Sequence, residues 1–444
     1  MIRLKSLRIA VLVVAAFAAS SCGIFKKGSG PKTPVLGERI PVLTSETDVK
    51  ADPATLALPF SLPPAVENSG WTQSGGNATK SMGQLALGQS LTQAFDVESG
   101  RGSSLTARLA AAPIVANGRV YTIDTLGTVR SFDAKTGAKV WESPTPDVRG
   151  NEASLYGGGI AYDNERIYAT NGLGFVAALD ARNGGIVWKV RPGGPLRGAP
   201  TIANDAVYVV SEDNQIYSLK EEDGSTNWSE AASLEIAGVF GSASPSAGQG
   251  TIVAGFSSGE LNGYRYENGR QVWQDTLQRT SITTSVSSLS DIDADPVIDS
   301  GQVFAVGQGG RMVALDLTSG QRMWELNIAG IATPWLVGDW IYVVTDEAKL
   351  LCIYRQNGHV RWIAQLPQFE KPKSKKGEID YKGPVLAGNR LILTGSNGTI
   401  VQIDPATGNY ISQMSIKASI SLPPVVANST LYILDDNARL HAYR

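Results

Sequence analysis

The chain of 444 residues carries 39 Lys and Arg against 41 Asp and Glu, a formal net charge of -2, which argues against the basic surface that nucleic-acid binding requires. Hydrophobic residues make up 42% and charged residues 18%, with 48 Gly and 22 Pro, so a disordered chain is excluded and a turn-rich β protein is favoured. The only Cys residues are Cys22 and Cys352 and the only His residues are His359 and His441, which excludes a disulfide framework, a four-Cys zinc site and a His-rich metal centre.

The first 22 residues have the organisation of a secretory signal peptide. Basic residues at 3, 5 and 8 precede an apolar run over 9–19, which is too short to span a bilayer because a spanning helix needs about 20 residues. Small residues at 19–21 end at Cys22, an arrangement that resembles a bacterial lipobox, in which the thiol and the new amino terminus are acylated. We predict a signal peptide over 1–21 and lipidation of Cys22; ordinary cleavage without acylation is the alternative.

The segment that follows Cys22 is expected to be a tether. Gly rather than Asp stands at position 23, which by resemblance to bacterial lipoprotein sorting indicates the outer membrane as the destination. From there to about residue 69 the chain is rich in Gly, Pro, Ser and Lys and shows no sustained periodicity. The sequence therefore predicts a lipidated N-terminus and flexible tether over 22–69, with the folded domain over 70–444.

Eight copies of one unit fill the rest of the chain. Each copy contains a polar turn followed by an apolar strand that carries an aromatic or aliphatic residue, and a second alternating strand follows. The copies are spaced by 38 to 51 residues and lie at 118–121, 165–168, 205–208, 250–253, 301–304, 339–342, 389–392 and 429–432. Such a period indicates a repeat architecture rather than two or three ordinary domains.

Six of the copies continue with a turn Gly and a Trp four residues later. The pairs are Gly137 and Trp141, Gly184 and Trp188, Gly224 and Trp228, Gly269 and Trp273, Gly320 and Trp324, and Gly358 and Trp362. Gly supplies a positive φ in a hairpin turn, and the Trp that starts the next strand is expected to pack between neighbouring sheets. The seventh turn, which ends at Gly408, has Ser412 in place of the Trp, so that blade must be packed differently.

About four short strands per copy predict an all-β fold, an eight-bladed β-propeller of four-stranded antiparallel blades over 70–444. The eighth copy reaches only its third strand by residue 444, which would leave an exposed edge. We expect the missing outer strand to come from residues 91–97, before the first copy, with Phe95 standing in for the Trp. The ring would then be closed by an N-terminal strand in the last blade.

The Asp-x-x-x-Gly-x-x-x-Trp units resemble the repeats of quinoprotein-type eight-bladed propellers over roughly residues 71–444. Within that superfamily two families compete. One comprises alcohol and glucose dehydrogenases that use pyrroloquinoline quinone, an adjacent Cys pair and a calcium ion. The other is the BamB family, lipoproteins of the complex that inserts β-barrels into the outer membrane. The sequence has no adjacent Cys pair, and Cys352 lies in an apolar stretch typical of an inert buried thiol.

Three segments resemble the BamB family more specifically: residues 37–43 after the anchor, the loop at 196–200 and the acidic loop at 290–296. In that family the two loops contact BamA, so the resemblance implies a partner-binding site at Leu196, Arg197, Asp291 and Asp293. The loop at 192–195 departs from the family pattern, which puts the apolar part of the contact in doubt. From the residues alone we expect an exposed Arg and an exposed acidic pair suited to a partner of complementary charge. Without the resemblance, an ordinary surface charge and turn caps are the favoured reading.

The sequence as a whole indicates a periplasm-facing, lipid-anchored outer-membrane scaffold with no enzymatic activity and no cofactor, which binds BamA and through it the assembly complex. Unfolded outer-membrane protein clients are possible further partners. A quinone-dependent dehydrogenase and a binding module for another envelope partner are the alternatives. Asp291, Asp293 and Asp295 have the spacing of a calcium loop, but Pro296 and Gln302 replace the Gly and Glu that such a loop requires. Lysines at 371–376 predict a solvated insertion, or a contact with anionic headgroups or an acidic partner.

Overall fold

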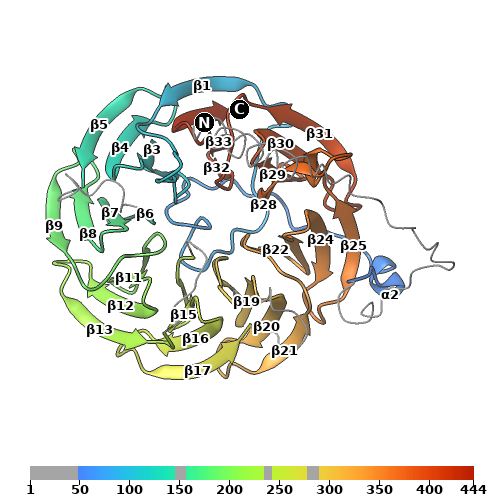
Figure 1. Ribbon diagram of the computed structural model, residues 1–444, viewed down its shortest axis with the longest axis horizontal. Coiled ribbons are helices and arrows are strands. Elements are labelled where there is room, and N and C mark those ends of the chain that lie inside the picture. The colour runs from blue at the N-terminus through green and yellow to red at the C-terminus, as the bar shows by residue number, and fades with distance from the viewer. Residues whose placement is uncertain (1–48, 146–156, 235–242, 278–289) are drawn as a thin grey trace, which may run out of the picture. The chain divides into compact units, whose positions relative to one another are not determined.

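The computed structural model describes residues 49–145, 157–234, 243–277 and 290–444, so the predicted signal peptide and Cys22 lie outside the described residues. Eight four-stranded antiparallel sheets form the blades of a ring (Figure 1). The predicted eight-bladed propeller is therefore confirmed. Within the described ranges, no helix has the length and apolar character needed to cross a membrane.

The blades are numbered in chain order, and each is given from its inner strand, which faces the centre, to its outer strand on the rim. Blade 1 contains β2 (Ile114–Ala116), β3 (Arg119–Ile123), β4 (Thr128–Asp133) and β5 (Lys139–Pro144). Blade 2 contains β6 (Gly158–Asp163), β7 (Arg166–Asn171), β8 (Val176–Asp180) and β9 (Ile186–Val190). Blade 3 contains β10 (Thr201–Ala203), β11 (Ala206–Val210), β12 (Gln215–Lys220) and β13 (Thr226–Ala231). Blade 4 contains β14 (Ser246–Gly248), β15 (Thr251–Gly255), β16 (Glu260–Arg265) and β17 (Gln271–Thr276).

The second half of the ring repeats this order. Blade 5 contains β18 (Val297–Asp299), β19 (Gln302–Gly307), β20 (Arg311–Asp316) and β21 (Arg322–Leu326). Blade 6 contains β22 (Trp335–Val337), β23 (Trp340–Val344), β24 (Lys349–Tyr354) and β25 (Val360–Gln365). Blade 7 contains β28 (Tyr381–Ala387), β29 (Arg390–Gly395), β30 (Thr399–Ile403) and β31 (Tyr410–Ser415). Blade 8 contains β32 (Val425–Ala427), β33 (Thr430–Leu434), β34 (Arg439–Tyr443) and β1 (Gln93–Glu98).

The six Trp residues join neighbouring blades. Each indole packs against the turn Gly of the following blade, where an added Cβ would lie only 2.5 to 2.7 Å from the ring. Each indole N–H also donates to the carbonyl three residues before that Gly, over 2.7 to 3.2 Å. The Gly therefore provides both the positive φ of the turn and the space for the ring, which explains why Gly and Trp recur together.

Blade 8 closes the ring as expected, because its outer strand β1 pairs with β34. Phe95 of β1 occupies the place of the Trp, and an added Cβ on Gly137 would lie 2.6 Å from its ring. Phe95 cannot donate a hydrogen bond, and the guanidinium of Arg444 instead donates to the Ala134 carbonyl over 2.8 Å. Strands β34 and β1 are not joined by a turn, so the preceding blade has no turn Gly to contact, which accounts for Ser412.

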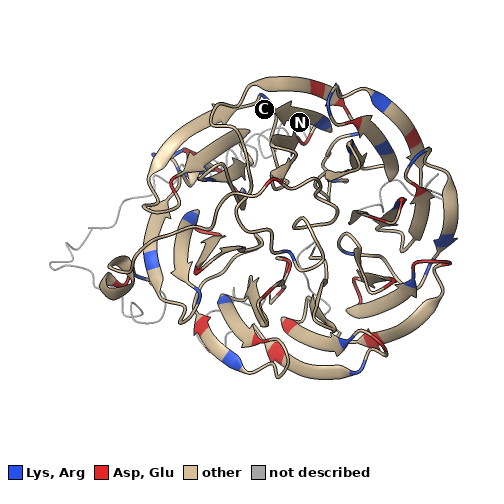
Figure 2. Cartoon of the chain, turned by 180° about the vertical axis from the view of Figure 1, so that it is seen from behind, with Lys and Arg blue, Asp and Glu red and all other residues tan. Residues whose placement is uncertain are grey.

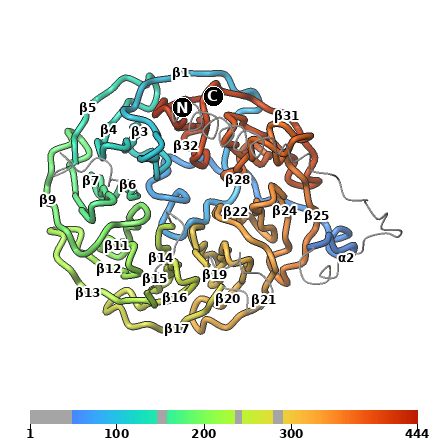
Figure 3. The backbone as a smooth tube through the Cα atoms, in the orientation of Figure 1, coloured from blue at the N-terminus to red at the C-terminus, as the bar shows by residue number. Residues whose placement is uncertain are grey.

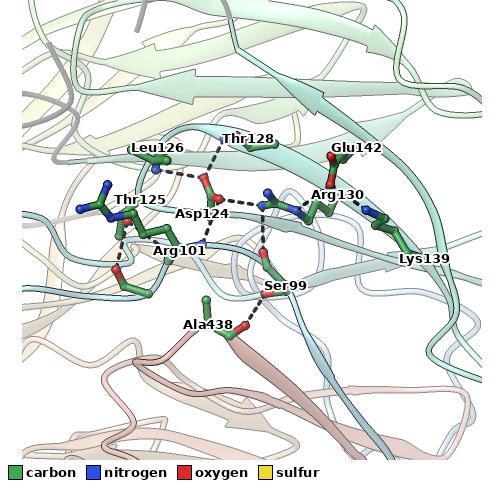
Figure 4. A network of polar contacts seen from close by, with 11 residues as sticks. Ser99, Arg101, Asp124, Thr125, Leu126, Thr128, Arg130, Lys139, Glu142 and Ala438 are labelled. Atoms are coloured by element: carbon green, nitrogen blue, oxygen red, sulfur yellow. Dashed lines mark hydrogen bonds and ion pairs between the residues drawn. The ribbon is translucent and has the colours of Figure 1, made fainter. Parts of the chain in front are cut away.

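A polar network ties the segment after β1 to blade 1 (Figure 4). The Arg130 guanidinium donates to the Asp124 carboxylate over 2.7 Å and to the Ser99 carbonyl over 3.1 Å. The backbone N–H of Arg101 donates to the same carboxylate, and the N–H of Ser99 donates to Ala438 in blade 8. These contacts join the first and last blades beyond the strand pairing itself.

Residues 49–69, expected to belong to the tether, pack on the propeller. The short helix α2 (Pro53–Leu56) lies against β25, and the Arg361 guanidinium donates to the carbonyls of Thr55 and Leu58. Phe60 stacks on Trp340 with ring centroids 5.4 Å apart. The expectation of a tether as far as residue 69 is thus wrong for 49–69, because periodicity reveals strands and not an irregular segment held by side-chain contacts.

Residues 68–85, which we term the strap, then make one circuit of the ring's centre (Figures 1 and 3). The strap meets the inner strand of every blade in ring order, starting from blade 8. Its contacts are Asn68 with Val426, Trp71 with Val115, Thr72 with Tyr162, Gln73 with Ile202, Ala78 with Ala247, Thr79 with Ile298, Gly83 with Trp335 and Leu85 with Leu386. The inner strands have no neighbour on their central side, so the strap satisfies backbone groups that would otherwise lack a partner.

The lysine-rich insertion forms a small hairpin of β26 (Phe369–Lys371) and β27 (Lys376–Glu378) between blades 6 and 7. Its lysine side chains are exposed, as expected for a solvated insertion. Around the rest of the ring, basic and acidic residues are mixed rather than gathered into a patch of one sign (Figure 2).

Candidate functional site

The connections from each outer strand to the next inner strand lie at one end of the blades, which we term the loop face. The turns that contain the repeated Gly lie at the opposite end, because an outer strand begins at such a turn and ends at a connection. Leu196 and Arg197 lie in the connection between β9 and β10, and Asp291 and Asp293 in the connection between β17 and β18. All four therefore belong to the loop face, as the sequence predicts.

The structure brings the predicted site residues together. The Arg197 guanidinium lies 3.1 Å from an Asp293 carboxylate oxygen and 3.4 Å from an Asp291 carboxylate oxygen. The backbone of Arg197 is fixed as well, since its N–H donates to Val210 and its carbonyl accepts from Gly158. This ion-pair cluster, Arg197 with Asp291 and Asp293, connects the loop that enters blade 3 to the loop that enters blade 5.

The expectation of exposed charges is wrong. The side chains of Arg197, Asp291 and Asp293 are 4%, 0% and 6% exposed, so the cluster is internal. Leu196 is fully buried in a core cluster that includes Tyr168 and Val209. Opposite charges on two loops can form ion pairs within the chain or with a partner protein. A single sequence does not distinguish these two arrangements.

Burial dominates the electrostatics of the cluster. It raises the pKa of Asp293 to about 6, against the opposing effect of Arg197. One guanidinium nitrogen of Arg197, Nη1, is buried and has no hydrogen-bond partner within the described ranges. Removing one member of a buried ion pair leaves an uncompensated charge and typically costs about 3 to 5 kcal/mol. Charge reversal at these positions would therefore perturb the fold as well as any contact.

Two apolar side chains on the loop face were missed by the sequence reasoning. Leu105, between β1 and β2, is fully exposed, and Leu234, just after β13, is 71% exposed. Both lie in irregular segments outside the repeat, where periodicity carries no information. Each is a single exposed apolar side chain that a partner protein could cover.

A cavity of about 140 Å³ lies at the ring's centre. It is lined by strap residues such as Trp71 and Lys80, by Asp293 and Asp295 of the connection before β18, and by Lys382 of β28. Burial lowers the pKa of Lys80 to about 8, despite the opposing effect of Asp295, and it raises the pKa of Asp295. Lys80 donates to Thr201 over 3.1 Å. The strap thus forms part of the wall of this cavity.

The three Asp residues with calcium-loop spacing do not converge. Asp291 and Asp293 face Arg197, whereas Asp295 accepts from the Ser74 hydroxyl over 2.6 Å and from the Ser244 N–H over 2.7 Å. Among the described residues, no group of three His, Cys, Asp or Glu side chains could hold a metal ion. Cys352 is fully buried, and burial raises the pKa of its thiol to about 12, so at neutral pH it stays a protonated core residue.

Comparison with solved structures supports the fold. The crystal structure of BamB from Moraxella catarrhalis matches with a TM-score of 0.68 at 19% identity, covering 80% of this chain and 100% of that one. A quinohemoprotein alcohol dehydrogenase from Comamonas testosteroni matches with a TM-score of 0.66 at 13% identity, covering 85% and 81%. The BamB structure and the dehydrogenase structure both match the fold of this chain, so the fold does not distinguish between the two families.

Sequence comparison does separate them. The chain is 29% identical over 333 residues to the outer membrane protein assembly factor BamB of Vibrio cholerae, covering 74% of this chain and 82% of that protein. It is 26% identical over 365 residues to the protein of the same name from Escherichia coli, covering 72% and 81%. A family model described as outer membrane protein assembly factor BamB matches residues 102–156 and 125–364. More than half of the chain is matched, and the chain belongs to the BamB family.

Proposed function

We propose that this chain is a non-enzymatic scaffold of the outer-membrane β-barrel assembly machinery, and that it binds the periplasmic region of BamA and supports the delivery and insertion of outer-membrane proteins. Membership of the BamB family is the observation that carries the proposal. Cys22 would anchor the chain in the outer membrane through its acyl chains, with the propeller in the periplasm.

The loop face is the proposed contact. Leu196, Arg197, Asp291 and Asp293 are carried over from the family, and their burial changes the role that we assign to them. The ion-pair cluster would hold two connections in the shape that the partner recognises, while exposed neighbours such as Leu234 would make the direct contact. Arg191, exposed just after β9, would supply charge at the edge.

The contact can be tested with variants that leave the ion-pair cluster intact. Leu234→Asp and Arg191→Glu change exposed side chains of the loop face, and Lys135→Glu is the matched control because it lies in an exposed turn at the opposite end of blade 1. We expect Leu234→Asp to weaken BamA affinity tenfold or more if Leu234 is central, which corresponds to about 1.4 kcal/mol. Equal affinity for the wild type and all three folded variants would refute the loop face as the contact.

The anchor is tested separately. Cys22→Ala should abolish incorporation of labelled palmitate and release the protein from the outer-membrane fraction, because the acyl chains provide the membrane affinity. Unlabelled wild type together with unchanged fractionation of Cys22→Ala would contradict the proposed lipidation.

A further inference from the structure

The central cavity contains two opposite charges that do not neutralise each other directly. Lys382 reaches it from β28, and Asp293 reaches it from the connection before β18. Asp380, Asp293 and Asp346 all act on Lys382 electrostatically, yet no ion pair within contact distance joins Lys382 to Asp293 among the contacts of the described residues. Burial lowers the pKa of Lys382 against the opposing effects of Asp380, Asp293 and Asp346, so the ammonium group has lost part of its hydration.

The remaining charged groups of the cavity are better satisfied. Asp295 accepts hydrogen bonds from Ser74 and Ser244, and Lys80 donates to Thr201. One Asp293 oxygen accepts from Arg197. Among the described residues, neither the ammonium of Lys382 nor the second carboxylate oxygen of Asp293 has a hydrogen bond, and Lys80 uses one of its three donors.

A third polar group on the wall also lacks a partner. The hydroxyl oxygen of Ser244 is buried and has no hydrogen-bond partner in the described part of the chain. Buried hydroxyl groups are nearly always hydrogen-bonded, so a buried orphan beside a cavity indicates a polar occupant. Apolar walls complete the site, with Trp71 and Trp335 stacked at 6.1 Å and Pro384 beside them in the lining.

We propose that the central cavity binds a small zwitterionic amino acid, with its carboxylate at Lys382 and its ammonium group at Asp293. The size agrees with this class of ligand, because a cavity of about 150 Å³ accommodates benzene, a molecule of six heavy atoms. Alanine has the same number of heavy atoms and would fill the 140 Å³ here. Water alone would make no apolar contact with the Trp and Pro side chains of the wall. The site is independent of BamA binding and does not rest on the proposed function.

Isothermal titration calorimetry on the full chain tests the proposal with glycine, alanine, acetate, methylammonium and tryptophan as probes. We expect glycine and alanine to bind, and acetate and methylammonium to bind at least about tenfold more weakly, because each offers only one of the two charges. Tryptophan should be rejected by its size. Acetate binding as tight as that of alanine, or no binding of any probe, would overturn the assignment.

A pair of Lys variants locates the site. Lys382→Met should weaken alanine binding at least about tenfold, whereas Lys376→Met removes an exposed lysine of the β26–β27 hairpin and should leave it unchanged. Unchanged affinity in folded Lys382→Met would overturn the assignment. If Lys382→Met does not fold, the comparison of alanine with acetate and methylammonium on the wild type still decides the question.

Discussion

The contact between Phe95 and Gly137 helps to close the ring, and its contribution to stability can be tested by adding a single methyl group to Gly137. In Gly137→Ala the new Cβ would lie 2.6 Å from the Phe95 ring, at a backbone φ of +74°. Gly118→Ala is a matched control in the same blade, since its φ is +71° and no atom lies within 4 Å of the new Cβ. Both variants pay the left-handed strain of a non-Gly residue, about 1 to 2 kcal/mol, and only the first also overpacks an interface.

Overpacking typically costs about 1 to 3 kcal/mol, so Gly137→Ala should be less stable than Gly118→Ala by that amount. For a chain of this size the difference corresponds to a Tm lower by about 1 to 4 °C. Urea unfolding monitored by circular dichroism gives the free-energy difference, and calorimetry gives the Tm. Equal stability of the two variants would refute the role of Phe95 as the substitute for the interblade Trp.

A double-mutant cycle gives a sharper answer. Phe95→Ala removes the ring against which the added methyl group clashes, so Gly137→Ala should cost about 1 to 3 kcal/mol less in the Phe95→Ala background than in the wild type. Gly118→Ala should cost the same in both backgrounds, since its Cβ touches nothing. An interaction free energy of zero between positions 95 and 137 would show that blades 8 and 1 are joined by other contacts.

Three further outcomes are expected. Trp228→Phe keeps an aromatic ring but loses the 2.8 Å hydrogen bond from the indole N–H to the Tyr266 carbonyl. Urea unfolding should therefore show a free energy of unfolding lower by about 1 to 2 kcal/mol. An unchanged free energy of unfolding would mean that water replaces the indole as the donor. The pKa of Asp293 is raised to about 6, so the folded state binds its proton more tightly than the unfolded state, and the stabilisation present below about pH 4 is lost by about pH 6. Asp293→Asn should remove up to about 3 kcal/mol of that pH dependence, and parallel stability curves for the two proteins between pH 4 and 7 would contradict this reasoning. Cys22→Ser removes the other Cys residue, so that a thiol reagent reports on Cys352 alone. The buried thiol of Cys352 should then react only after unfolding. Rapid reaction of the folded protein would show that blade 6 opens locally.

The repeated parts of the molecule could be predicted from the sequence because one physical solution is used many times. The turn Gly and the Trp four residues later recur at fixed spacing, so the number of blades, their strands and even the substitution of Phe95 follow from that pattern. The strap could not be predicted, because its residues bind to each blade through one or two backbone or side-chain hydrogen bonds that follow no periodic pattern.

The candidate site was predicted in position but not in exposure. Both loops could be located from their place in the repeat, and their charges could be read directly. Whether Arg197 points to solvent or to Asp291 and Asp293 depends on how the two connections cross the loop face. That path is set by irregular segments with no counterpart in the repeat.

The strap also constrains the order in which the molecule can fold. Asn68 bonds to Val426, and the two residues are 358 positions apart in the chain. Trp71, Thr72 and Gln73 contact three successive blades, so the strap has no complete binding surface until the whole ring exists. The segment that is synthesised before any blade must therefore dock last, and such long loop closures are slow because their entropy is lost before the contacts form. Until the strap docks, the central edges of the inner strands stay unpaired. A chain that reaches the periplasm unfolded would therefore be most prone to aggregate in the interval before docking.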